Sequence, residues 1–150
     1  FHDMWGFPSN NPKVVSGLLR HLIDKIENNV NEINMYKEYW MDDAEYVLVS
    51  YGSSARSAIH MARNRRTRGV KIGVLELQTL WPFPEDMVRE KCSGAKAVMV
   101  VEMNAGQVLT QVKNAVENPN TVFLANRMDG QLISPTDIKT HFRMIQGKGV

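Results

Sequence analysis

The chain has 150 residues, of which 43% are hydrophobic and 23% are charged, and its formal net charge at pH 7 is +2. This length suits one globular domain with a sizeable core, and so small a charge gives no reason to expect a nucleic acid or a membrane as partner. The single cysteine, Cys92, excludes an internal disulfide and a cysteine-ligated zinc or iron–sulfur site, and favours a reducing compartment such as the cytoplasm.

The first thirty residues predict an irregular segment followed by an amphipathic helix. Residues 1–11 mix Gly, Pro, Ser and Asn with aromatic residues. Asn11 stands where an N-cap belongs, and Pro12 occupies the first helical position. Apolar residues then recur at helical spacing up to about residue 30, at Val15, Leu19, Leu22, Ile26 and Val30. Because the chain opens with Phe1 and not with methionine, we expect further residues upstream.

From residue 33 onward, predicted strands alternate with predicted helices. The strands are expected at residues 33–40, 46–51, 70–77, 96–103 and 121–126. The helices are expected at residues 53–69, from about 85, at 106–117 and at 134–145. Near-continuous apolar strands separated by helices are typical of a parallel sheet covered on both faces, in a doubly wound α/β fold. The strand at 33–40 is the candidate antiparallel edge, because a short turn joins it to the next strand.

Ligands and partners of such a sheet meet the loops at the carboxyl ends of its strands, and the first of these loops is residues 51–56. Ser53 or Ser54 can cap the following helix, whose free N–H groups attract an anion, and Arg56 could supply a fixed cation. A capped helix with a solvated arginine is the simpler alternative, and it remains open.

The second loop, residues 79–86, is stiffened by two prolines. Pro82 and Pro84 fix two φ angles, so Trp81 and Phe83 are held rigidly outward or against a neighbour. These four residues are candidates for a protein interface, and core packing of the aromatics is the alternative.

The third loop, residues 102–107, gathers polar groups where a strand gives way to a helix. Glu102 ends a buried strand, so its carboxylate needs a donor such as a main-chain N–H or Arg56. Asn104 can cap the following helix, and Gly106 allows the close approach of a backbone or a ligand. Because Glu102, Asn104 and Gln107 converge, a ligand or partner is favoured over the alternative, a capped helix with one buried acid.

Two other patterns are weaker. The arginine-rich run at 63–68 falls at a helix C-terminus, where the helix dipole favours cations, so a nucleic-acid patch ranks last. The four histidines, at positions 2, 21, 60 and 141, show no metal-ligand spacing. No catalytic residue and no metal ligand is predicted.

Taken together, the stretches DAEYVLVSYGSSAR, ELQTLWPFP and VVEMNAGQV resemble, in order and approximate spacing, a known domain. It is the C-terminal domain of the alpha subunit of 2-oxoacid:ferredoxin oxidoreductases, most like the 2-oxoglutarate type. The opening HDMWGFPSNNP resembles the segment that leaves the thiamine-pyrimidine-binding domain of that subunit. A fainter similarity extends to the transketolase C-terminal domain and to the beta subunit of pyruvate dehydrogenase.

The resemblance implies a three-layer α/β/α domain with a five-stranded mixed, mostly parallel sheet in the order one-three-two-four-five, its first strand antiparallel. Residues 1–30 would be a linker and helix leading from a missing N-terminal domain, and residues 31–150 the transketolase C-terminal-like domain. The second and fourth strands would then be neighbours, with loops 51–56 and 102–107 facing each other across one crevice. A contact between Glu102 and Arg56 would satisfy both charges.

The resemblance also implies a function for the intact enzyme, which decarboxylates a 2-oxoacid on thiamine diphosphate and magnesium. That enzyme reduces ferredoxin through iron–sulfur clusters and forms an acyl-coenzyme A. This chain would hold none of these cofactors and would act as a non-catalytic assembly domain in contact with the beta subunit and its own N-terminal domain. Its crevice could contact coenzyme A, and a homodimer through the aromatic loop is also expected. The alternative is an independent module that binds a phosphate ligand between loops 51–56 and 102–107.

Overall fold

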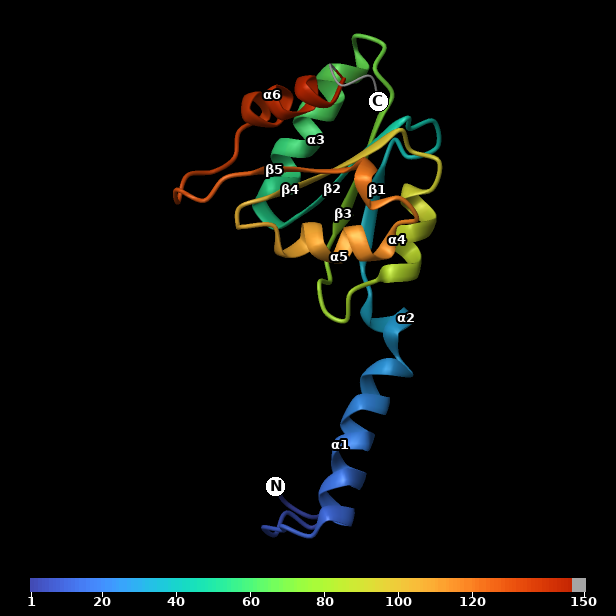
Figure 1. The fold of residues 1–150 in the computed structure, drawn as a ribbon, viewed down its shortest axis with the longest axis vertical. Helices are drawn as coiled ribbons and strands as arrows, with labels where there is room; N and C mark the ends of the chain where they lie inside the picture. Colours follow the sequence, from blue (N-terminus) through green and yellow to red (C-terminus); the bar gives the residue numbers. More distant parts are fainter. Residues whose placement is uncertain (147–150) are drawn as a thin grey trace.

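A computed structural model describes residues 1–146, so the end of the predicted domain at residue 150 lies outside the described residues. The chain forms an N-terminal arm that projects from an α/β body (Figure 1). Among the described residues, no helix combines the length and the apolar character that a bilayer crossing requires.

The arm consists of helix α1, Pro12–Glu27, and a short helix α2, Val30–Ile33. The N-cap is confirmed, because the side chain of Asn11 accepts a hydrogen bond from the main-chain N–H of Lys13 at 3.0 Å. The predicted single helix to residue 30 is wrong at its end. Asn29 donates from its side chain to the carbonyl of Lys25, and this competition with the helical bonds separates α2 from α1.

The sheet has five strands in the order β1-β3-β2-β4-β5, and β1 alone is antiparallel to its neighbour. The strands are β1 Tyr36–Tyr39, β2 Tyr46–Tyr51, β3 Ile72–Leu77, β4 Ala97–Glu102 and β5 Val122–Asn126. This confirms the predicted fold class and order. Strand β1 is shorter than the predicted range 33–40, because Ile33 still belongs to α2 and Trp40 turns the chain with a left-handed φ of 54°.

Two pairs of helices cover the two faces of the sheet (Figure 1). The pair on one face is α3, Gly52–Arg66, and α6, Pro135–Gln146; the pair on the other is α4, Glu85–Cys92, and α5, Gln107–Ala115. A 3₁₀ turn, Pro119–Thr121, leads into β5. Side chains alternate along each strand: Leu48 and Met99 pack beneath α3 and α6, whereas Val49 and Val100 pack against α4 and α5.

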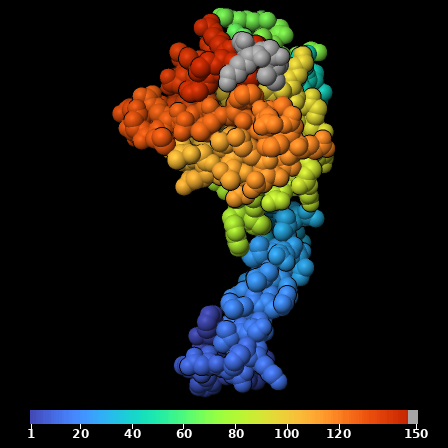
Figure 2. Space-filling model, viewed as in Figure 1, coloured from blue at the N-terminus to red at the C-terminus, as the bar shows by residue number. Residues whose placement is uncertain are grey.

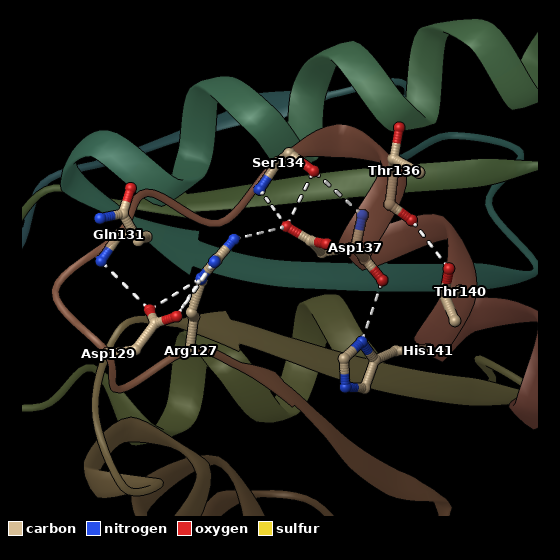
Figure 3. Close-up of polar contacts among 8 residues, drawn as sticks. All are labelled: Arg127, Asp129, Gln131, Ser134, Thr136, Asp137, Thr140 and His141. Atoms are coloured by element: carbon tan, nitrogen blue, oxygen red, sulfur yellow. Dashed lines mark hydrogen bonds and ion pairs between the residues drawn. The ribbon is translucent and has the colours of Figure 1, made fainter.

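The start of α6 is held by a polar network (Figure 3). Ser134 and Asp137 form a capping box, in which the Ser134 hydroxyl accepts from the Asp137 N–H and the Asp137 carboxylate accepts from the Ser134 N–H. Arg127 forms ion pairs with both Asp129 and Asp137. The Ser134 N–H and hydroxyl, together with the charge of Arg127, lower the pKa of Asp137. Ser134 therefore caps α6, and Arg127 ties the start of this helix to the chain segment that follows β5.

Candidate functional site

The loops that follow β2 and β4 meet at one edge of the sheet, as predicted. The two strands are parallel neighbours, with Ser50 in register with Val101. The Ser50 hydroxyl donates to the Val101 carbonyl at 2.8 Å. One step further, the side-chain amide of Asn104 donates to the hydroxyl of Tyr51 at 2.5 Å. Loops 51–56 and 102–107 are therefore joined by direct hydrogen bonds.

Glu102 is fully buried, with 0% of its surface exposed. Its two carboxylate oxygens accept from the main-chain N–H groups of Val108 at 3.0 Å and Leu109 at 3.1 Å, and the Tyr51 hydroxyl lies at 3.4 Å. These N–H groups form the positive end of α5. The predicted pairing with Arg56 is wrong: Arg56 is exposed, and within residues 1–146 it makes no ion pair with Glu102. The strand runs directly under the helix that follows it, so main-chain donors reach the carboxylate instead.

Asn104 completes the closure of this helix end from its side chain, although the N-cap residue of α5 is Gly106. Its side-chain oxygen accepts from the N–H groups of Gly106 at 2.9 Å and Gln107 at 3.0 Å. Its carbonyl accepts from the Asn126 side chain at 2.8 Å. With the two N–H groups bound to Glu102, the first turn of α5 has its donors satisfied within the chain. A phosphate ligand between loops 51–56 and 102–107 would therefore find the main-chain donors at the start of α5 already bonded, and its binding there stays a prediction.

The loop after β2 divides its predicted residues between the interior and the surface. Ser54 is buried, and its hydroxyl donates to the Tyr51 carbonyl at 2.7 Å. Neither serine caps α3, because its N-cap residue is Tyr51 and no side chain caps it. Ser53 and Arg56 are exposed, as is Gln107 across the gap. Of the predicted crevice residues, these three present their side chains to solvent.

Two residues that sequence reasoning missed connect the network. Tyr51 bridges Asn104 and Glu102, and Asn126 reaches Asn104 from the end of β5. Burial, followed by the negative charge of Glu102, raises the pKa of Tyr51. Each of these residues is the last of its strand. A search for polar residues at the ends of strands adjacent in the predicted order would have found them.

The loop at residues 79–86 also contains both buried and exposed predicted residues. Trp81 is 72% exposed, and Pro82 is half-buried. Phe83 packs against the core beneath α4 and α5, and Pro84 is buried immediately before α4. Of the two aromatic side chains of this loop, Trp81 is therefore the one that a partner could contact more fully.

The residues present do not fit an iron–sulfur cluster. The sequence contains one cysteine, Cys92, and burial raises the pKa of its thiol to about 12. Within the described part of the chain, no three His, Cys, Asp or Glu side chains are grouped so that they could hold a metal ion.

Comparison with known proteins assigns the α/β body to a family. The sequence pattern of the pyruvate:ferredoxin oxidoreductase core domain II matches residues 44–138. The 2-oxoglutarate synthase subunit KorA of Methanothermobacter marburgensis is 34% identical over 138 residues, which are 91% of this chain and 37% of that one. The ketoisovalerate oxidoreductase subunit VorB of the same organism is 42% identical over 118 residues, 79% of this chain and 33% of that one. The chain thus spans about a third of the length of these relatives.

Solved structures show the same fold. The 2-oxoglutarate:ferredoxin oxidoreductase from Magnetococcus marinus superposes with a TM-score of 0.82 at 18% identity, over 96% of this chain and 25% of that chain. A split-gene transketolase superposes with a TM-score of 0.62 at 15% identity, over 74% of this chain and 41% of that one. The predicted transketolase-like fold is confirmed. Since the family pattern covers more than half of the sequence and its fold agrees, this chain belongs to the family of the pyruvate:ferredoxin oxidoreductase core domain II.

Proposed function

We propose that this chain is a non-catalytic assembly domain of the alpha subunit of a cytoplasmic 2-oxoacid:ferredoxin oxidoreductase. Relatives named for 2-oxoglutarate and ketoisovalerate support the 2-oxoacid class, and 2-oxoglutarate is the substrate to test first. In this proposal the intact enzyme decarboxylates the 2-oxoacid, reduces ferredoxin and forms an acyl-coenzyme A. Thiamine diphosphate, magnesium and the iron–sulfur clusters are held by other parts of the enzyme.

The burial of the reactive groups supports a non-catalytic role. The Glu102 carboxylate is fully enclosed and bonded to two main-chain N–H groups, so it cannot contact a substrate. Cys92 is 6% exposed, and its raised pKa keeps the thiol protonated at neutral pH. Ser53, Arg56 and Gln107 remain at the edge where β2 and β4 end, and we propose that they contact protein or coenzyme A there.

The observation that carries the assembly role is the arm. No residue of α1 is buried, although the helix is amphipathic. Leu22 is 49% exposed and Ile23 53%, and Trp5 in the preceding loop is 76% exposed. Figure 2 shows the arm extending away from the body. Burying an exposed leucine or isoleucine stabilises a protein by about 1.5–3 kcal/mol. Covering the apolar face of α1 with another protein segment is therefore energetically favourable.

We propose that the cover is the thiamine-pyrimidine-binding domain of the same subunit, with residues 1–30 as the linker and helix that lead from it. The beta subunit is the second partner, contacted by the body from residue 31 onward. The exposed Trp81 suits such a contact, and it would mediate the expected homodimer if this chain were isolated. The length of the relatives supports a large covering segment, since 63% or more of each lies outside the match.

The test uses the full-length alpha subunit co-expressed with its beta subunit. Leu22→Asp places a carboxylate on the apolar face of α1, and Arg20→Asp places the same group on the polar face as a control. We expect Leu22→Asp to reduce the assembled complex in size-exclusion chromatography with light scattering and to reduce 2-oxoglutarate-dependent ferredoxin reduction in proportion. Arg20→Asp should retain both. Normal assembly and activity of the Leu22→Asp enzyme would refute the proposal.

A further inference from the structure

The arginine-rich run at 63–68 separates into residues with different surroundings. Arg66 forms an ion pair with Asp43 at 2.6 Å, and the Arg63 guanidinium lies 6.0 Å from the ring centre of Trp40. Arg65 and Arg68 instead line a cavity of about 440 Å³ between α3 and α6, which we name the α3–α6 cavity. Its remaining charged or titratable lining residues are Lys139 of α6 and His60 of α3.

The positive charge in the α3–α6 cavity is not balanced. No aspartate or glutamate is among the residues that line it. Neither Arg68 nor Lys139 forms an ion pair or side-chain hydrogen bond within residues 1–146. Some cations elsewhere on the body are matched, as where both Lys71 and Lys96 contact Glu45. The α3–α6 cavity therefore concentrates cations that the described chain leaves without acidic partners.

Arg65 supplies a second, independent observation. Its terminal nitrogen donates to the Gln146 side chain at 3.1 Å, and its guanidinium lies 6.0 Å from the ring centre of Phe142. Its Nε atom is buried and has no hydrogen-bond partner. A buried donor without an acceptor costs free energy, and the contacts with Gln146 and Phe142 hold Arg65 in this position at the lining of the α3–α6 cavity.

Helix dipoles explain only part of this arrangement. Arg65 lies in the last turn of α3, where the negative end of the helix favours a cation. Lys139 lies in the first half of α6, toward the positive end, where the dipole gives no such reason. The helix packing, anchored by the capping box at Ser134, brings this lysine to the arginines of α3.

We propose that the α3–α6 cavity binds a small molecule carrying at least two linked phosphate groups. Arginine and lysine are the side chains that bind phosphate oxygens through charge-assisted hydrogen bonds. Asn64 and Thr136 line the same cavity and carry neutral donors. A volume of about 440 Å³ lies within the roughly 300–1,000 Å³ typical of small-molecule sites. This site is separate from loops 51–56 and 102–107 and does not depend on the assembly role.

The test titrates inorganic pyrophosphate into this chain by isothermal calorimetry at fixed ionic strength, with sulfate and a single-stranded oligonucleotide in parallel. The variant Arg68→Ala/Lys139→Ala removes two cations from the cavity. The control Lys37→Ala/Lys113→Ala removes two exposed cations elsewhere, on β1 and α5. Thermal unfolding of both variants confirms that they are folded.

We expect pyrophosphate to bind more tightly than sulfate, and the cavity variant to weaken pyrophosphate at least about tenfold, since each 1.4 kcal/mol of lost interaction is a factor of ten. The control should stay within about twofold. Equal weakening in both variants would overturn the proposal in favour of general charge attraction. Binding of the oligonucleotide with no response to pyrophosphate would also overturn it, as would pyrophosphate binding no tighter than that of sulfate.

Discussion

Replacing Glu102 by glutamine tests whether the polar cluster after β4 is a structural support. The change keeps the size of the side chain and removes its charge. A glutamine amide has one acceptor oxygen, so it can retain one of the bonds to Val108 and Leu109, and it turns an NH₂ group toward the other N–H. The Tyr51 hydroxyl, which lies 3.4 Å from the Glu102 carboxylate, does not replace the lost main-chain hydrogen bond.

The expected loss follows from these contacts. A buried main-chain donor left without an acceptor costs about 1–3 kcal/mol. Losing a negative charge at the N-terminus of α5 costs about 0.3–2 kcal/mol more. Relief from burying a charge offsets part of this sum. We therefore expect Glu102→Gln to lower the free energy of unfolding by about 2–3 kcal/mol.

Urea unfolding followed by far-ultraviolet circular dichroism measures this loss, and amide hydrogen exchange at Val108 and Leu109 locates it. The control is Glu117→Gln, which removes the same charge from an exposed side chain and should change stability by less than about 0.5 kcal/mol. If Glu102→Gln unfolded like the control and both amides kept their protection, the structural reading of Glu102 would be wrong.

Two further changes probe the backbone and the buried thiol. Gly106→Ala should destabilise the protein by about 1–2 kcal/mol, because Gly106 has a φ of 101°. Gly17→Ala should instead stabilise α1 by about 0.5–1 kcal/mol, because a methyl group at Gly17 meets open space. Denaturant midpoints of the two variants measure these changes, and equal midpoints would contradict the left-handed backbone at Gly106. The raised pKa of Cys92, about 12, means that its contribution to stability is complete below the ordinary thiol pKa of about 8.5 and falls as pH rises toward 12. The free energy of unfolding of Cys92→Ala should therefore fall less steeply with pH above about pH 8.5. If its slope against pH equalled that of the unmodified protein, this account of Cys92 would be wrong.

The fold class could be predicted from local patterns because each strand carries its own signal. Leu48 and Val49 sit in an unbroken apolar run, which is what burial on both faces requires. The ends of the helices and strands were harder to predict from the sequence. The residues around Trp40 do not predict its left-handed φ, so the end of β1 was predicted at the wrong residue. The interruption of the first helix at Asn29 depends on a single side-chain bond to Lys25.

The candidate site could be located from the sequence but not understood from it. Parallel neighbours place their carboxyl ends together, so the meeting of loops 51–56 and 102–107 followed from the strand order that the resemblance implied. The partner of Glu102 did not follow. The charge of Glu102 led us to predict a partner of opposite charge, Arg56. In the folded chain, the main-chain N–H groups of Val108 and Leu109 bind the carboxylate instead.

The amino-acid sequence alone determined the alternation of elements, the burial of the strands and the identity of the polar residues at their ends, because spacing and residue type act over a few neighbouring positions. Tertiary structure decided which donors satisfy Glu102, and that Lys139 joins Arg65 and Arg68 around one cavity. These groups lie far apart along the chain, and packing of α6 on α3 brings the lysine to the arginines. Hydrogen bonds and charges act over a few ångströms, so only the folded path could select their partners.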